Sequence, residues 1–283
     1  MISHAGSHAR SHARSHARSH ARIAVLDLDG TLAEGSLAAP FVESLIAGGV
    51  CEPEAGRAAL AAIAGYHDED AGPGDSAAHA PTAAAFYAHF ARALEGADRS
   101  DVERAAEAAW PAARKKILPF ADELVRLLHA AGLRTVLISG SPYEIVRRAA
   151  AELGIGEAHG MRAEFRRGRC TGALTATPAL PGGKRAALRT ATKGSPVDRR
   201  SSFAIGNSPS DAEVFEQVGL AIAFEPDPVL RGWAVDRDWI TADRRDVLAV
   251  CQDLIATHPA LGATPETARG TSRGAGLGVT GPH

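Results

Sequence analysis

A short apolar run that ends in two aspartates constrains the fold of this chain more than any other feature. Ile23-Ala24-Val25-Leu26 is apolar throughout, which predicts a buried strand, and Asp27-Leu28-Asp29-Gly30-Thr31 follows it directly. In open parallel α/β sheets, the ligand crevice lies just outside the carboxyl ends of the strands. The sequence therefore predicts that Asp27 and Asp29 lie at a reaction centre on the edge of such a sheet.

The spacing of the two aspartates favours a joint role. Side chains at positions i and i+2 leave a strand on the same face, so Asp27 and Asp29 could address one small substrate together. Two close carboxylates repel each other and need a cation, a shared proton or separate roles. The alternative interpretation is an aspartate-rich turn after an ordinary strand, and the rest of the chain decides between the two.

Three further segments place polar residues next to a predicted strand or helix. They are Thr135-Val136-Leu137-Ile138-Ser139-Gly140-Ser141, Pro181-Gly182-Gly183-Lys184, and Ser202-Phe203-Ala204-Ile205-Gly206-Asn207-Ser208-Pro209-Ser210-Asp211. A serine hydroxyl and free backbone N–H groups would bind phosphate oxygens without adding charge. Lys184 is one of four lysines in a chain with 27 arginines, and a compact ammonium can enter a tight anion site. Singly, each segment could be merely structural, but in series they meet at one sheet edge.

With these four segments in this order, the sequence resembles the haloacid dehalogenase (HAD) superfamily of phosphohydrolases over roughly residues 22–255. The first motif of that family, Asp-x-Asp-x-Thr, is matched by Asp27, Asp29 and Thr31. The second is matched by Ser139, the third by Lys184, and the fourth by the segment from Gly206 to Asp211. Secondary similarities around residues 162–172 and 225–230 are typical of the phosphoserine-phosphatase-like branch.

The resemblance implies a role for each matched residue, and the chemistry of the side chains agrees. Asp27 is the expected nucleophile, which forms an aspartyl-phosphate, and Asp29 is the expected general acid/base. Lys184 and Mg²⁺ would offset the charge of nucleophile and phosphate. The expected phosphate contacts are Gly30, Thr31, Ser139, Gly140 and Lys184, and the expected metal ligands are Asp27, Asp29, Asn207 and Asp211. The predicted function is a Mg²⁺-dependent phosphomonoesterase that hydrolyses a small metabolite phosphate.

Asn207 departs from the family pattern, which usually has an aspartate there. An amide oxygen can ligate Mg²⁺ but adds no negative charge, so the affinity for the metal is expected to fall. Two alternatives therefore stay open: a catalytically impaired homologue that binds a phosphorylated ligand or a partner, and a phosphotransferase. Phosphoserine phosphatases of this branch also carry a glutamate at the position of Ser36, and Glu34 is offset from it, which speaks against serine phosphate as the substrate.

The pattern along the chain predicts an α/β fold, a doubly wound parallel sheet with a small helical cap inserted after the first strand. The expected catalytic core comprises residues 22–36 and 111–261, and the expected cap comprises residues 37–110. Within the cap, helical periodicity covers residues 41–47, 55–64, 81–94 and 100–110, around a loop at Asp68 to Asp75. An insertion just after the nucleophile is well placed to act as a lid. Residues 1–21, with a Ser-His-Ala-Arg repeat, and residues 262–283 are expected to be disordered tails.

Composition limits the partners. The formal net charge of −2 gives no electrostatic reason to expect nucleic-acid binding, and no apolar run reaches the 18 or so residues that a membrane span needs. Cys51, Cys170 and Cys251 lack paired spacing, which fits a reducing cytoplasm rather than a disulfide framework or a zinc site. We therefore expect a cytoplasmic monomer or homodimer whose partner is a small phosphorylated metabolite.

Overall fold

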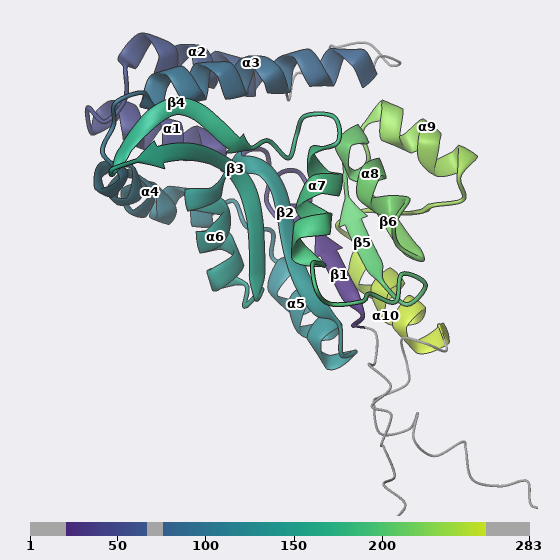
Figure 1. Cartoon of the computed structure of the whole chain (residues 1–283). Coiled ribbons are helices and arrows are strands. Elements are labelled where there is room, and N and C mark those ends of the chain that lie inside the picture. The colour runs from purple at the N-terminus through teal and green to yellow at the C-terminus, as the bar shows by residue number, and fades with distance from the viewer. Residues whose placement is uncertain (1–20, 67–75, 259–283) are drawn as a thin grey trace, which may run out of the picture.

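The computed structural model describes residues 21–66 and 76–258 and contains a seven-stranded sheet (Figure 1). The expected tails and the expected loop at 68–75 lie outside the described residues, apart from Ala21. The strands are β1 (Ile23–Leu26), β2 (Arg134–Pro142), β3 (Glu157–Arg166), β4 (Arg169–Ala176), β5 (Phe203–Gly206), β6 (Leu220–Phe224) and β7 (Ile240–Ala242). They run in the order β4-β3-β2-β1-β5-β6-β7, and every neighbouring pair is parallel except β3 and β4. The predicted α/β class is thus confirmed.

The central strand β1 is buried on both faces because its residues alternate between two hydrophobic clusters. Ala24 and Leu26 join the cluster that contains α5 (Ala121–Ala130), α6 (Tyr143–Glu152) and α10 (Val247–Thr257). Ile23 and Val25 join the cluster formed with α7 (Gly183–Ala191), α8 (Ala212–Phe215) and α9 (Pro228–Asp236). Helices on both faces leave the edge at the strand ends open, and this is where ligands bind in such sheets.

Four helices, inserted between β1 and α5, form a cap above the sheet edge in Figure 1. They are α1 (Ala38–Ala47), α2 (Pro53–Tyr66), α3 (Ser76–Leu94) and α4 (Arg99–Arg114). Each contains one of the helices expected from periodicity and extends beyond it. Pro111, which follows the expected end of the fourth helix, lies inside α4 rather than terminating it. Cap residues such as Phe41 and Phe90 belong to the same hydrophobic cluster as Leu28 and Leu32, so cap and core share one apolar interior.

A β-hairpin that the sequence patterns did not predict projects from the sheet toward the cap. Strands β3 and β4 pair antiparallel, and the turn residues Arg167 and Gly168 both have positive φ, 51° and 85°. This is the backbone conformation of a tight two-residue hairpin turn. Strand β4 contacts α3, so the hairpin supports the cap from the core side (Figure 1). The predicted doubly wound parallel sheet is thus present, with one antiparallel strand added at this edge.

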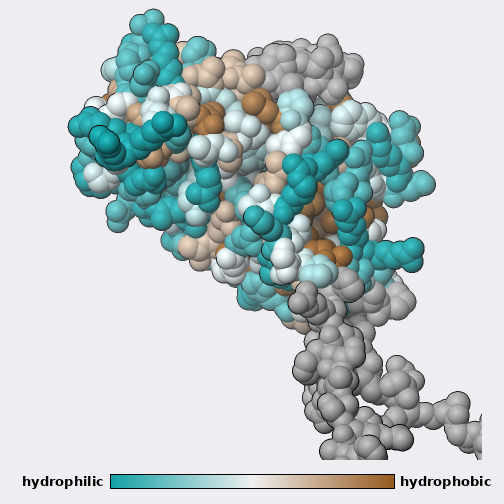
Figure 2. Space-filling model, in the orientation of Figure 1, coloured by the Kyte–Doolittle hydropathy of each residue, from teal (hydrophilic) through white to brown (hydrophobic). Residues whose placement is uncertain are grey.

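The outer surface gives little sign of an extended hydrophobic docking face. On the side shown in Figure 2, hydrophobic residues appear in separate small patches among hydrophilic ones. Val235, with 74% of its surface accessible, is the one large hydrophobic residue that is strongly exposed within the described ranges. None of the described helices is long and apolar enough to cross a membrane.

Candidate active site

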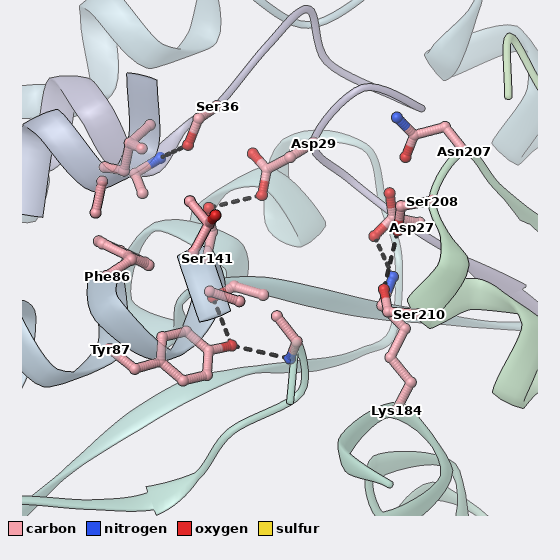
Figure 3. A pocket seen from close by; sticks show the side chains of 17 residues that line it. Asp27, Asp29, Ser36, Phe86, Tyr87, Ser141, Lys184, Asn207, Ser208 and Ser210 are labelled. Atoms are coloured by element: carbon pink, nitrogen blue, oxygen red, sulfur yellow. Dashed lines mark hydrogen bonds and ion pairs between the residues drawn. The ribbon is translucent and has the colours of Figure 1, made fainter. Parts of the chain in front are cut away.

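Asp27 lies at the carboxyl end of β1, where its backbone and its side chain are both held by hydrogen bonds. Its amide donates to the carbonyl oxygen of Ile205 on β5 at 3.0 Å. Its carboxylate is 6% exposed. Oδ1 accepts a hydrogen bond from Nζ of Lys184 at 2.7 Å (Figure 3). Oδ2 accepts one from Oγ1 of Thr31 at 2.9 Å. A buried carboxylate that is paired and still borders a cavity is an arrangement suited to a reactive group.

Lys184 reaches Asp27 because two glycines let α7 begin close to the core. Gly182 has a φ of +80°, which favours glycine, and precedes the helix directly. A Cβ on Gly183 would lie 2.2 Å from the carbonyl oxygen of Thr177, so the backbones approach more closely than any other residue allows. Lys184 itself is 3% exposed, and its ammonium bridges Asp27 and Asp211. The predicted role of Lys184 as a buried cation at the sheet edge fits this placement.

Asp211 positions its neighbours with both carboxylate oxygens. Oδ1 accepts from Nζ of Lys184 at 2.5 Å. Oδ2 accepts from the amides of Asn207 and Ser208, at 3.1 and 3.0 Å, and from the hydroxyl of Ser208 at 3.0 Å. Gly206 makes room for this carboxylate, since a Cβ there would lie 2.2 Å from its Cγ. Direct metal ligation by Asp211, which the sequence predicted, would break part of this network, so the geometry favours an indirect role through Lys184.

The electrostatics of the three buried charges are strongly coupled. Burial, together with the nearby Asp211 and Asp29, raises the pKa of Asp27 to about 7, against the lowering effect of Lys184. For Lys184, burial disfavours the ammonium, but Asp211 and Asp27 outweigh it and hold the pKa of Lys184 above its ordinary value. Two carboxylates thus share one ammonium. The negative charge of this group is not fully balanced, so a cation beside Asp27 would be stabilised.

Asp29 is held by donors from β2 and from the start of the cap. Its Oδ2 accepts from the hydroxyls of Ser139 and Ser141, at 2.9 and 2.7 Å, and its Oδ1 accepts from the amide of Leu37 at 2.7 Å. Both serines can reach Asp29 because side chains two residues apart on a strand lie on the same face of the sheet. Figure 3 shows Asp29 turned toward Ser141. Sequence reasoning assigned no role to Ser141, although its spacing of two from Ser139 was a usable signal.

The predicted phosphate contacts differ in availability. The amides of Gly30 and Thr31 donate to the carbonyl oxygens of Ala33 and Leu28, at 2.8 and 3.2 Å, and so shape the turn. Ser139 is fully buried and bonded to Asp29, whereas Gly140 borders the cavity. Gly140 and Lys184 thus border the cavity, whereas the amides of Gly30 and Thr31 and the hydroxyl of Ser139 are engaged within the protein. The five phosphate contacts remain predictions.

Asn207 completes a set of oxygen donors that fits Mg²⁺. The inward atom of its amide lies 3.2 Å from the carbonyl oxygen of Asp29 and 3.3 Å from Oδ2 of Asp27. As the amide nitrogen, this atom donates hydrogen bonds to both oxygens and to Oγ1 of Thr31. Rotation of the amide by 180° would instead present its oxygen, which together with Oδ2 of Asp27 and the Asp29 carbonyl is the kind of ligand that a hard cation prefers. Within the described ranges there is no cluster of three or more His, Cys, Asp or Glu residues that could hold a metal. A site at Asp27 would therefore depend on Asn207 and a backbone carbonyl.

A cavity of about 610 Å³, which includes the part open to solvent, lies between core and cap. We call its two sides the core wall and the cap wall. The core wall is formed by Asp27, Asp29, Ser36, Gly140, Ser141, Ala179, Lys184, Asn207, Ser208 and Ser210. The cap wall is formed by Ala38, Ala62, Ile63, Thr82, Ala83, Phe86 and Tyr87. Figure 3 shows Phe86 and Tyr87 across the cavity from Asp27 and Asn207.

Fold and site together define an α/β protein with a carboxylate–lysine centre at the carboxyl edge of its sheet. The family model of the haloacid dehalogenase-like hydrolases matches residues 24–216. The chain therefore belongs to this family, as the four motifs predicted.

Several curated proteins with similar sequences are named phosphoserine phosphatases. A phosphoserine phosphatase of Streptomyces coelicolor is 27% identical over 210 residues, which cover 74% of this chain and 45% of the relative. Phosphoserine phosphatase SerB1 of Mycobacterium tuberculosis is 31% identical over 148 residues, which cover 52% of this chain and 48% of the relative. The chain thus spans about half the length of these relatives.

Solved structures share the fold. A Bordetella pertussis protein of unknown function matches with a TM-score of 0.63 and 22% identity over 80% of this chain and 99% of that one. A substrate-bound phosphoserine phosphatase complex matches with a TM-score of 0.57 and 20% identity over 81% of this chain and 98% of that one. At these identities the similarity shows a common fold.

Proposed function

We propose that this protein is a Mg²⁺-dependent phosphomonoesterase that hydrolyses a small metabolite phosphate through an aspartyl-phosphate on Asp27. The observation that carries the proposal is the buried Asp27 carboxylate, which borders the cavity while Lys184 and Thr31 hold it in place. Family membership and the names of the relatives support a phosphatase. The three cysteines are free and buried, which is consistent with the proposed cytoplasmic location.

In the proposed first step, a carboxylate oxygen of Asp27 attacks phosphorus and the bond from phosphorus to the ester oxygen breaks. Lys184 balances charge on the nucleophile and on the transferring group, and backbone groups near Gly140 hold the phosphate oxygens. Asp29 gives a proton to the leaving alkoxide. Asp211 acts by holding Lys184, because both of its oxygens are engaged with its neighbours.

In the second step, water attacks the aspartyl-phosphate and restores the Asp27 carboxylate. Asp29, now deprotonated, accepts the proton of the attacking water. Ser139, Ser141 and Leu37 keep its carboxylate in one orientation during both steps. Mg²⁺, held by Asp27, the Asp29 carbonyl and Asn207, would supply Lewis-acid stabilisation of charge on the phosphoryl oxygens. Because Asn207 retains an oxygen donor, we favour an active enzyme over an impaired homologue.

The test is direct detection of the covalent intermediate. Phosphate release from a panel of phosphate monoesters is measured with Mg²⁺ and with a chelator, and acid-quenched protein is analysed by mass spectrometry for phosphorylated Asp27. We expect Mg²⁺-dependent release, a phosphorylated peptide that contains Asp27, and loss of both by at least about a thousandfold in Asp27→Asn. Release that persists in Asp27→Asn at the wild-type rate would refute the covalent mechanism.

A further inference from the structure

We propose that the substrate is the phosphate monoester of a neutral, predominantly apolar alcohol or phenol, rather than of an amino acid or another charged alcohol. This inference rests on the proposed phosphatase function and assigns a chemical class to the group that the phosphate leaves. The observation that carries it is the contrast between the core wall and the cap wall.

Among the described residues, every charged side chain that lines the cavity comes from the core wall. Asp27 and Lys184 are paired with each other, and Asp29 accepts three hydrogen bonds. A phosphate bound beside Lys184 and Asp27 therefore directs the rest of its ester toward the cap, away from these groups. The leaving group must be recognised by what the cap wall offers.

The cap wall offers mainly apolar surface. Ile63 on α2 and Ala83 and Phe86 on α3 are each at least nine-tenths buried, and Ala62 lies beside them. In the part of the chain whose side chains the structure describes, the cap wall contributes no charged group. Removal of apolar surface from water is favourable, so an alkyl or aryl group would be stabilised here.

The polar groups of the cap wall do not replace a charged partner. The Tyr87 hydroxyl donates to the carbonyl oxygen of Gly140 and accepts from the amide of Ala179, both at 3.0 Å. The hydroxyl of Ser36, on the core wall, accepts from the amide of Ala38 at 3.1 Å. Thr82 adds one neutral hydroxyl group. Among the side chains that the structure describes, the cap wall offers an ammonium or carboxylate no opposite charge in return for its lost hydration, which disfavours binding of a charged alcohol.

The decisive comparison uses two alkyl esters of similar size, n-butyl phosphate and phosphoethanolamine, with O-phosphoserine as a third substrate. The ammonium makes ethanolamine the better leaving alcohol, so a preference for n-butyl phosphate must come from binding. We expect kcat/KM for n-butyl phosphate to exceed that for each charged ester by about tenfold or more. The proposed substrate class would be wrong if kcat/KM for a charged ester were equal or higher. If Asp27→Asn also abolished that activity, the phosphatase function would still stand.

A matched pair of variants tests the wall itself. Thr82→Asp places a carboxylate in the cap wall and should reduce the preference for n-butyl phosphate over phosphoethanolamine by about tenfold, because the new charge can pair with the ammonium. Thr82→Asn has nearly the same shape without the charge and should keep the wild-type ratio. An identical ratio in both variants would show that the leaving group does not contact this wall, and would overturn the inference.

Binding separates this inference from the proposed function. If no ester is hydrolysed, the phosphatase proposal fails, and calorimetric titration of Asp27→Asn with n-butyl phosphate and phosphoethanolamine still decides the ligand class. Tighter binding of n-butyl phosphate by about tenfold would support an apolar ligand. The inferred ligand class would be wrong if n-butyl phosphate bound no more tightly than phosphoethanolamine, or if neither ester bound.

Discussion

The core wall of the cavity carries Asp27, Asp29 and Lys184, whereas the cap wall facing it carries Ile63, Ala83 and Phe86. In the core wall, each charged side chain has at least two hydrogen-bond partners. The cap wall consists of helix side chains that pack against one another. Side chains in a bonded network can be changed only together, while packed apolar side chains can be exchanged singly. The comparison therefore assigns the reaction to the core and the choice of substrate to the cap.

The largest effect is expected from Lys184→Ala in the core wall. The change leaves Asp27 and Asp211 buried without their shared cation, which should cost about 3–5 kcal/mol of unfolding free energy. Phosphate release should fall by about a hundredfold or more for all esters alike. Urea denaturation and kinetics on two substrates measure both effects. Lys193→Ala, at an exposed position, is the control. If Lys184→Ala changed the substrate preference but not the rate, the assignment of the reaction to the core wall and of substrate choice to the cap wall would be wrong.

The second expectation concerns the affinity for Mg²⁺. Asn207→Asp adds a carboxylate next to Asp27 and the Asp29 carbonyl. The interaction energy between two unit charges ~4 Å apart is roughly 4 kcal/mol at an effective dielectric near 20, before the cost of desolvation reduces it. We expect Mg²⁺ to bind about tenfold or more tightly, with higher phosphate release at low Mg²⁺. Calorimetric titration measures the affinity.

Gln217→Glu adds the same charge outside the cavity and serves as the control for Asn207→Asp. Unaltered affinity in Asn207→Asp would show that position 207 does not face the metal. Equal gains in both variants would show a long-range effect of net charge rather than ligation.

A smaller effect is expected from Ser141→Ala. The variant removes one of three hydrogen bonds to Asp29 but leaves Ser139 and the Leu37 amide in place. Because Asp29 should act in the chemical step, kcat should fall by about three- to tenfold while KM changes little. Steady-state kinetics on n-butyl phosphate and phosphoethanolamine checks this. A rise in KM for one ester alone would place Ser141 in substrate recognition instead.

The smallest effect is expected where the two walls meet, at Tyr87. Tyr87→Phe leaves the Gly140 carbonyl and the Ala179 amide without this partner, which should lower the unfolding free energy by about 1–2 kcal/mol. Thermal unfolding followed by circular dichroism measures it. Tyr143→Phe removes a hydroxyl for which the described residues provide no hydrogen bond, and is the matched control. Equal stability of the two variants would mean that the Tyr87 contact does not hold cap and core together.

The features that could be predicted from the sequence are those with local causes. An apolar run before Asp27 and Asp29 predicts both a buried strand and its reactive end, because the strand, the turn and the two carboxylates are contiguous. Lys184 was found by its rarity and by the glycines before it. The helices of the cap followed from their apolar periodicity, although their ends were set too short.

The features that escaped prediction depend on contacts between distant segments. The β3–β4 hairpin is rich in charge because it lies at the sheet edge, so its pattern resembles a loop. The role of Ser141 follows from its hydrogen bond to Asp29, which lies 112 residues away in the sequence. Which side of α2 and α3 faces the cavity depends on how these helices pack, so the apolar cap wall was not visible in the sequence.

The hydrogen bond from the Leu37 amide to Asp29 has a consequence for the order of events in a reaction cycle. Leu37 is the last residue before α1, so the proposed proton donor is attached to the first helix of the cap. A displacement of that end of α1, as substrate enters or product leaves, must stretch or break this bond and free an oxygen of Asp29. Any such displacement would couple the entry of substrate and the exit of product to the orientation of the Asp29 carboxylate.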